Sequence, residues 1–540
     1  MNVSVASYGI LDAEMNAIRN QPNKDEVKLL FVNCCLRRHS PTKVLPVGLG
    51  YVMTYAHEHG YTNFDLLDVD IADYDDAFVE SYLQQKSYDV ILLGSIVTHY
   101  KWVKWFLAAA KKHQPNATLV VGNSVAGSIY ELFLSKTPAD IVVIGEGEIT
   151  TYEALEALRL GRPLGDVEGL AFRDGNGHIV KTPKRKATDI NSLPMPNWDF
   201  FDVPKYIEKS AHTITYGASD DEGPRTIPLP ISTARGCAFR CTFCHFVFWD
   251  DPYRLRTPES VLAEVKRNRD RYGANYANFW DDLSFSSLLQ VDRMCDAILA
   301  SGLTFNWMAS IRCDLFGRER LPYDKRLKAA QKMKAAGCVA VGFSLESGNP
   351  EILEMMNKKI EASFFAEQVQ ILREVGIVCN TSVVFGYPIE TPETIQQTFD
   401  MCLQARVYPS IGFLLPLPYT GMYDYAKAHG FIPDEDAYLE AITERQDICL
   451  NMTKMSDAEI MDEIKRGASK LNEALDLGLA DEKLIKTGGY KKATNIKDFK
   501  KPPLDPDNIQ RNENDFSFNY SDAAFEVDAG MKKRLKMLPQ

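Results

Sequence analysis

The sequence predicts an α/β protein built from two consecutive parallel sheets, and three observations support this prediction. Short strand-like apolar runs alternate with amphipathic segments from residue 27 onward, which is typical of parallel sheets. A stretch at 191–204 that contains Pro and Asn divides these runs into two groups. Residues after 433 lack strand-like runs. We therefore expect a doubly wound domain, a partial (β/α)6 barrel and a mainly helical C-terminal extension.

The first group of runs predicts a Rossmann-like domain at 27–165, preceded by an N-terminal arm at 1–26. Its strand candidates lie at 27–35, 64–70, 89–97, 117–123 and 140–148, with amphipathic segments at 49–59, 100–112 and 128–135. Ligands of doubly wound sheets bind outside the carboxyl ends of the strands. No GxGxxG follows the first strand, which argues against a dinucleotide ligand.

Residues 166–225 are expected to connect the two sheets. The segment 166–186 contains a GNG turn between two apolar runs and predicts a hairpin. The linker at 191–204 follows, and the polar, Gly-containing segment 211–225 predicts a surface loop.

The second group of runs predicts the partial barrel, at 226–433. Its strand candidates lie at 228–233, 276–280, 304–311, 339–345, 378–385 and 410–415, and the helix candidates at 258–272, 288–300, 324–336, 364–375 and 392–405. Chemistry in such barrels belongs at the carboxyl ends of the strands. The remainder, 434–540, predicts helix over 437–479 and a polar tail from residue 490.

Three cysteines follow the first barrel strand with the spacing CxxxCxxC, at Cys237, Cys241 and Cys244. Thiolates are soft ligands that suit iron–sulfur clusters or zinc better than calcium or magnesium. A structural zinc site needs four ligands, and no fourth cysteine has a matching spacing. We interpret His245 as a loop residue. The motif alone therefore predicts an iron–sulfur site with one open position.

Composition narrows the class of protein further. The net charge is −12, whereas nucleic-acid-binding surfaces are usually basic. No apolar run reaches the roughly 18 residues that a membrane-spanning helix needs, and the first 24 residues are too polar and acidic for a signal peptide. Eleven cysteines are too few for a disulfide scaffold in 540 residues. We expect a cytoplasmic protein that does not bind nucleic acid.

The cysteine motif, with Phe243 just before its last cysteine and β/α units around it, resembles the radical SAM superfamily. The first domain resembles the cobalamin-binding domain that precedes the barrel in the B12-dependent, class B methylase group. The segments that carry the resemblance are PVGLGYV at 46–52, DVILLGSIVTH at 89–99, VVGN at 120–123, GEGE at 145–148, FWDDLSF at 279–285, GFSLESGNPEIL at 342–353 and FGYPIET at 385–391.

The resemblance implies that the three cysteines bind a [4Fe-4S] cluster whose open iron chelates S-adenosylmethionine. Reduction then yields a 5′-deoxyadenosyl radical. By position, the resemblance assigns the S-adenosylmethionine site to Phe243, Trp280, Asp281, Asp282, Arg312, Ser344, Glu346 and Gly386. Trp280, Asp281 and Asp282 would receive the methionine amino group. Arg312, Ser344 and Glu346 would contact ribose and carboxylate, and Phe243 and Gly386 would line the adenine.

The resemblance also implies a cobalamin whose nucleotide tail is surrounded by the small residues at the strand ends of the first domain. These residues are Ser95, Thr98, Gly122, Asn123, Gly145 and Glu146. The chain contains no DxHxxG, so histidine ligation of the cobalt is not expected. A lower ligand would come from elsewhere or be absent.

Cobalamin-dependent methylation of an unactivated carbon of a small molecule, through a 5′-deoxyadenosyl radical and methylcobalamin, is the leading hypothesis. The resemblance also implies an electron donor such as flavodoxin or ferredoxin. A second hypothesis keeps both cofactors but ends in oxidative cyclisation or ring rearrangement, as in the anaerobic cyclase of chlorophyll synthesis. A methylthiotransferase would need a second cysteine triad, and only Cys34 and Cys35 are available in the first domain. A non-catalytic metal or electron-transfer protein would need a fourth thiolate. The substrate stays open.

Overall fold

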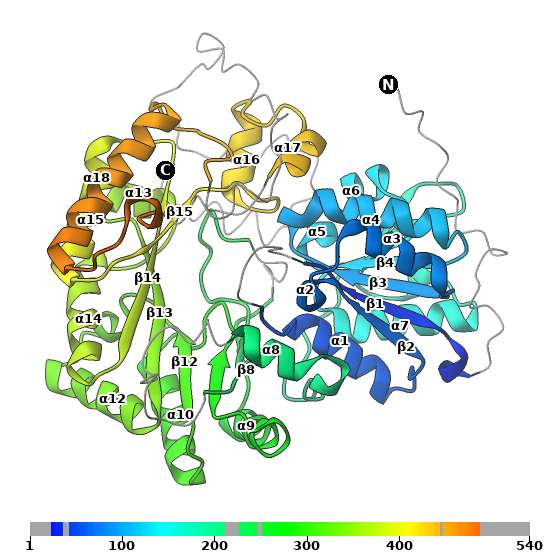
Figure 1. Ribbon diagram of the computed structural model, residues 1–540, viewed down its shortest axis with the longest axis horizontal. Helices are drawn as coiled ribbons and strands as arrows, with labels where there is room; N and C mark the ends of the chain where they lie inside the picture. The colour runs from blue at the N-terminus through cyan, green and yellow to red at the C-terminus, as the bar shows by residue number, and fades with distance from the viewer. Residues whose placement is uncertain (1–22, 36–42, 211–225, 246–250, 443–446, 486–540) are drawn as a thin grey trace.

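A computed structural model describes residues 23–35, 43–210, 226–245, 251–442 and 447–485. Most of the expected N-terminal arm, the loop at 211–225 and the polar tail from residue 490 lie outside these ranges. The described chain forms two α/β domains that lie beside one another, with C-terminal helices next to both (Figure 1). The predicted fold class is confirmed.

The sheet of the first domain has seven strands within the described residues, in the order β2-β1-β3-β4-β5-β6-β7. The first five are parallel. Their bounds are β1 (Leu29–Asn33), β2 (Phe64–Asp68), β3 (Val90–Gly94), β4 (Thr118–Gly122) and β5 (Ile141–Val143). All five lie within the predicted runs, which are rich in Val, Ile and Leu because both faces of a parallel sheet are buried.

Helices cover both faces of this sheet. The helices are α1 (Val47–Glu58), α2 (Val69–Ala72), α3 (Asp76–Gln85), α4 (Tyr100–His113), α5 (Ser124–Gly127), α6 (Tyr130–Lys136) and α7 (Gly147–Leu160). Alternate strand residues point to opposite faces. Leu30 and Val32 accordingly pack with α3, α4 and α6, whereas Leu29 and Phe31 pack with α1 and α7. The domain is therefore doubly wound.

The predicted hairpin is present and joins this same sheet. Strand β6 (Leu170–Arg173) pairs antiparallel with β5, and β7 (Ile179–Lys181) pairs antiparallel with β6. The expected boundary at residue 165 therefore falls inside one sheet. The linker after the hairpin is also packed, since Trp198 is fully buried against Gly50 of α1, and helix α8 (Val203–Ser210) follows it.

The second domain contains all six predicted strands in one parallel sheet, in the order β15-β14-β13-β12-β11-β8. Their bounds are β8 (Pro228–Ile231), β11 (Tyr276–Phe279), β12 (Asn306–Ser310), β13 (Cys338–Glu346), β14 (Val378–Phe385) and β15 (Ser410–Phe413). Each strand pairs with the next one in the chain, as in a barrel. Six strands leave the barrel partial, as predicted. A short two-stranded sheet of β9 (Ala234–Arg235) and β10 (Arg254–Leu255) flanks the cysteine loop.

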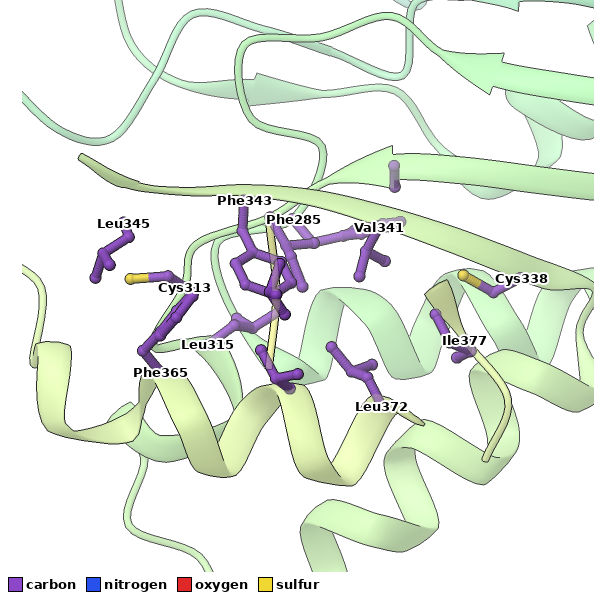
Figure 2. Packing of buried hydrophobic residues seen from close by; sticks show 14 of the residues in the cluster. Phe285, Cys313, Leu315, Cys338, Val341, Phe343, Leu345, Phe365, Leu372 and Ile377 are labelled. Carbon is purple, nitrogen blue, oxygen red and sulfur yellow. The ribbon is translucent and has the colours of Figure 1, made fainter. Parts of the chain in front are cut away.

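One face of the second sheet packs on its crossover helices. These are α9 (Pro258–Tyr272), α10 (Leu288–Ser301), α11 (Leu315–Arg318), α12 (Tyr323–Ala335), α14 (Phe365–Glu374) and α15 (Pro392–Ala405). Helix α13 (Pro350–Met355) belongs instead to the cluster that contains Val384 and Tyr387. Figure 2 shows Phe343 and Val341 of β13 facing Phe365 and Leu372 of α14. The predicted helix ends agree with local signals: α9 begins with Pro258 after the capping residue Thr257 and ends at the left-handed Gly273.

The C-terminal helices connect the two domains. They are α16 (Gly421–Ala428), α17 (Glu435–Ala441) and α18 (Asp457–Leu475). Helix α18 packs on α15, where Ile460 and Ile464 join the core of the second domain. Helix α17 packs on α4 of the first domain, and Asp436 accepts hydrogen bonds from Tyr100 (2.6 Å) and Lys104 (3.0 Å). No helix among the described residues combines the length and apolar character needed to cross a membrane.

The contact of α18 with α15 predicts the effect of one substitution. A Cβ added at Gly467 would lie 2.2 Å from Cδ2 of Phe399, which is buried on α15. We expect Gly467→Ala to lower the free energy of unfolding, because overpacking costs about 1–3 kcal/mol and outweighs the gain of about 1 kcal/mol in helix propensity. Thermal unfolding followed by circular dichroism measures this loss. Gly165→Ala is the control, since no atom lies within 4 Å of its added Cβ. Equal unfolding temperatures for the two variants would contradict this packing.

Candidate functional site

The cysteine loop is held between the second sheet and α16. The amide of Thr242 donates to the carbonyl of Met356 (2.9 Å), and the amide of Met422 donates to the carbonyl of Thr242 (2.9 Å). Nδ2 of Asn357 donates to the carbonyl of Arg240 (2.7 Å). The loop therefore has backbone contacts with the ends of two helices, which place its thiols at the carboxyl edge of the sheet.

The three predicted cysteine ligands lie together. Burial raises the pKa of each thiol. For Cys244 the charges of Cys241 and Cys237 raise the pKa further, so the three sulfurs interact. Among the residues the structure describes, no three His, Cys, Asp or Glu side chains are grouped around a single ion position. Three thiolates are soft ligands, and this donor set would hold an iron–sulfur cluster.

The two adjacent aspartates after β11 have different surroundings. Asp281 accepts from the backbone amides of Thr233 (2.8 Å) and Ala234 (3.1 Å) and from the hydroxyls of Thr233 (2.5 Å) and Ser284 (3.0 Å). Burial raises its pKa to about 6. Asp281 therefore holds the strand that leads into the cysteine loop, and its oxygens are already occupied. Of the assigned pair, it is the less suitable for a ligand.

Asp282 is the free carboxylate of the pair. No described residue pairs with it, and although its side chain is exposed on the cavity, partial desolvation raises its pKa. Its charge acts on Cys237 and Cys244, so it lies near the cysteine loop. Trp280 beside it is 49% exposed. A carboxylate near an open cluster is a suitable partner for an ammonium group.

A buried ion pair lies on the other side of the loop. Nζ of Lys358 donates to Oε1 of Glu346 (2.8 Å), and the two side chains are 14% and 5% exposed. Oε2 of Glu346 has no hydrogen-bond partner, although buried polar atoms usually have one. Sequence reasoning missed Lys358, the cation whose charge acts most on Cys241. Its only signal was its place twelve residues after Glu346.

Of the remaining predicted contacts for S-adenosylmethionine, Arg312 touches the loop and Phe243 is part of it, whereas Ser344 contacts the neighbouring strand. Arg312 stacks over the ring of Phe239 (3.5 Å) and binds Asp314 and the carbonyl of Lys358. Its guanidinium therefore contacts the cysteine loop at Phe239. Phe243 packs edge-on against the buried Tyr387. Ser344 shares a hydrogen bond of 2.7 Å with Ser382.

Gly386 ends strand β14 with φ of 103°, a conformation that favours glycine. Its amide donates to Oε2 of Glu390 (3.2 Å), whose pKa burial raises to about 7. The buried carboxyl group of Glu390 thus binds the backbone at the start of the loop after β14, within the predicted segment 385–391.

A cavity of about 620 Å³ lies between the two domains. From the first sheet it is lined by Gly94, Gly122, Asn123, Gly145 and Glu146, and from the second by Ser232, Arg235, Gly236, Trp280, Asp281, Asp282 and Ser310, among others. The carboxyl edges of both sheets therefore face one another across this space.

Four of the six predicted cobalamin residues line the cavity, and two do not. Gly122, Asn123, Gly145 and Glu146 are lining residues. Ser95 and Thr98 are not, and the hydroxyl of Ser95 shares a hydrogen bond with His99 (3.2 Å). A Cβ at Gly145 would meet no atom within 4 Å, so the backbone there is open to a ligand. The carboxylate of Glu146 is bound by arginines, which leaves its backbone for the predicted role.

The residues present fit both implied cofactors. The cavity wall on the first domain is glycine-rich and open, which suits a large ligand approached by backbone. Among the described residues that line it, none is His or Cys. Beside the cysteines, the unpartnered Oε2 of Glu346 and the free Asp282 suit a ligand that carries hydroxyl and ammonium groups.

Comparison with known protein families agrees with this arrangement. Residues 231–402 match the radical SAM superfamily, and residues 34–155 match the B12 binding domain. The first match contains strands β11 to β14 of the second sheet, and the second contains strands β2 to β5 of the first sheet. The chain therefore belongs to the radical SAM proteins that have a B12-binding domain in front of the catalytic domain.

Three curated relatives match most of the described region. An uncharacterized methyltransferase of Pyrococcus horikoshii is 27% identical over 75% of this chain and 84% of its own length. The cytidylyl-2-hydroxyethylphosphonate methyltransferase of Streptomyces wedmorensis is 25% identical over 83% and 89%. The anaerobic magnesium-protoporphyrin IX monomethyl ester cyclase of Cereibacter sphaeroides is 26% identical over 66% and 56%.

Among solved structures, the cobalamin-dependent S-adenosylmethionine radical enzyme OxsB, with aqua-cobalamin and S-adenosylmethionine bound, superposes with a TM-score of 0.59. It is 16% identical, and the match covers 82% of this chain and 61% of OxsB. At this identity the likeness concerns the fold, which is the same succession of two domains.

The surroundings of Asp281 predict how the cluster is supported. Asp281→Ala leaves two backbone amides unpaired at about 1–3 kcal/mol each, so we expect a lower content of iron and sulfide after anaerobic reconstitution. Asp281→Asn should retain most of the iron, because its amide oxygen accepts the same two amides. Asp282→Asn is the matched neighbour and should load normally. Full iron content in Asp281→Ala would show that the strand does not depend on this side chain.

Proposed function

We propose that the chain is a cobalamin-dependent radical SAM methyltransferase that modifies an unactivated carbon of a small molecule. The observation that carries the proposal is the shared cavity, because it opens to the glycine-rich strand ends of the first domain and to Trp280 and Asp282 beside the cysteine loop. A substrate in this space would lie between a radical source and a methyl carrier.

The side chains around the cysteines support a binding site for S-adenosylmethionine. Asp282 is placed to pair with the ammonium group, and Lys358 provides a buried positive charge that a carboxylate could approach. The unpartnered Oε2 of Glu346 would accept a hydrogen bond from a ribose hydroxyl. When bound, the [4Fe-4S] cluster supplies the electron that cleaves S-adenosylmethionine, and the cobalamin supplies a transferable methyl group.

The relatives named methyltransferases support methyl transfer as the outcome, since two of them match most of this chain. A flavodoxin or ferredoxin is the proposed electron donor, and the cytoplasm is the proposed location.

Oxidative cyclisation or ring rearrangement is the second candidate. Its support is the match to the magnesium-protoporphyrin ester cyclase, of which the chain spans 56%. Both candidates use the same two cofactors, so only the fate of the methyl group separates them.

The proposal predicts that label from methyl-labelled S-adenosylmethionine enters the product. The reconstituted protein would be incubated with reductant, cobalamin and small-molecule fractions of host extracts, and products would be followed by mass spectrometry. Cys241→Ala is the control, since it removes one ligand of the cluster. Release of 5′-deoxyadenosine with a changed but unlabelled product would favour the cyclase candidate.

Asp282 predicts a second result. Asp282→Asn removes the charge that would face the ammonium group, and we expect the Kd for S-adenosylmethionine to rise about tenfold, or about 1.4 kcal/mol. Titration of the reduced cluster by electron paramagnetic resonance measures this binding. Glu361→Gln, an exposed carboxylate on the same domain, should leave the Kd unchanged. An unchanged Kd in Asp282→Asn would remove this residue from the site.

A further inference from the structure

Two carboxylates of the first domain cross the interface and bind arginines beside the cysteine loop. Oε1 of Glu146 accepts from Arg235 (3.1 Å) and from Arg254 (2.6 Å), and Oε1 of Glu148 accepts from Arg235 (2.5 Å). Glu146 and Glu148 are only 8% and 5% exposed. Burial acts to raise the pKa of Glu146, but the hydrogen bonds and charges of the two arginines hold it below its usual value. The group is therefore a buried network of opposite charges.

The two ends of this network belong to the two halves of the candidate site. Gly145 and Glu146 form the turn after β5 that lines the cavity. Arg235 lies in β9, two residues before Cys237. In the antiparallel β9–β10 ladder it is opposite Arg254. Asp281 holds the same strand from the second domain through the amides of Thr233 and Ala234. The strand that enters the cysteine loop is thus held from both domains.

Helix capping does not account for the position of the Glu146 carboxylate. Glu146 precedes α7 as its N-cap residue, yet its side chain makes no cap hydrogen bond. Instead Oε2 accepts from the amide of Thr188 (3.1 Å) and from Arg254 (3.2 Å), and Arg254 also donates to the carbonyl of Thr188 (2.6 Å). The carboxylate therefore joins three separate segments of the chain.

Energetics favour a geometric role over a purely stabilising one. Desolvation makes a buried ion pair weak support for stability, and apolar residues of the same size often stabilise as well. Bidentate guanidinium pairs are directional, however, and specify an orientation. The guanidinium of Arg235 also lies over the ring of Tyr51 on α1 (5.0 Å), which restricts its position from a further side.

We propose that Glu146, Glu148, Arg235 and Arg254 form a positioning clamp that sets the separation and orientation of the cysteine loop relative to the cobalamin cavity. These four are positioning residues, since their charged groups bind one another. The inference rests on the proposed function, because a defined separation matters only where two cofactors face a common substrate.

The test measures the magnetic interaction between the two cofactors and needs no substrate. The full chain is reconstituted anaerobically with iron, sulfide and cob(II)alamin. Power saturation of the cob(II)alamin signal is then recorded with the cluster oxidised and with the cluster reduced. In the wild-type protein, the reduced cluster should accelerate relaxation of the cobalt spin. In Arg254→Gln this acceleration should be lost or spread over a distribution, while iron content, bound cobalamin and cleavage of S-adenosylmethionine to 5′-deoxyadenosine are retained.

Glu156→Gln is the matched control. Glu156 lies on the same helix α7 and binds Tyr61 (2.8 Å) and Arg159 (3.0 Å), both within the first domain. It should lower thermal stability without changing the relaxation. If Arg254→Gln does not fold, Arg254→Lys replaces it, because lysine keeps the charge and loses the two-point contact with Glu146.

The outcomes separate the clamp from the proposed function. The proposed function would be overturned if the wild-type protein bound no cobalamin, or if the relaxation of its cobalt spin were the same with the cluster oxidised and reduced. Normal acceleration in the wild type together with the same acceleration in Arg254→Gln or Arg254→Lys would overturn only the clamp. Loss of acceleration in these variants, but not in Glu156→Gln, supports it.

Discussion

The strands of a parallel sheet all end at the same edge, and this geometric constraint organises the whole molecule. Loops that leave one edge can gather residues from many parts of the chain. Here the edges of two such sheets are turned toward a common cavity. Glycine backbone comes from one edge, and Trp280 and Asp282 come from the other. Neither sheet alone provides both kinds of wall, so the site depends on how the domains meet.

Two kinds of contact join the domains. Apolar side chains of the second domain, such as Leu229 and Tyr387, enter hydrophobic clusters that continue the core of the first domain. Such contacts are strong but not directional. The arginine pairs of Glu146 and the hydrogen bonds of Asp436 also join the two domains, and they are directional. Apolar side chains therefore hold the two domains together, and charged side chains set their relative orientation.

Sequence periodicity was sufficient to predict the parallel strands of both sheets, because a buried parallel strand is a continuous apolar run whichever strands it pairs with. It was insufficient for β6 and β7, since a hairpin signal does not say which sheet the hairpin joins. The spacing of the three cysteines was sufficient to predict them as one set of ligands, because they are close in the chain. Lys358 and Arg235 were missed because a single basic residue has no periodic signal. The partner of Lys358 is twelve residues away, and the partner Glu146 of Arg235 is 89 residues away. Asp281 and Asp282 are neighbours of the same type, so only the structure distinguishes the saturated carboxylate from the free one.

The same contrast indicates where the molecule is organised for binding rather than for stability. Asp281 has hydrogen bonds to both of its oxygens and supports the loop. Glu346 instead combines burial, a φ of 65° and an unpartnered Oε2. A left-handed backbone at a residue other than glycine costs of the order of 1–3 kcal/mol and persists where the surroundings enforce it. A fold that needed only stability would gain by relaxing this residue. Because Lys358 holds the other oxygen at 2.8 Å, the free oxygen of Glu346 stays available to a ligand beside the cysteines.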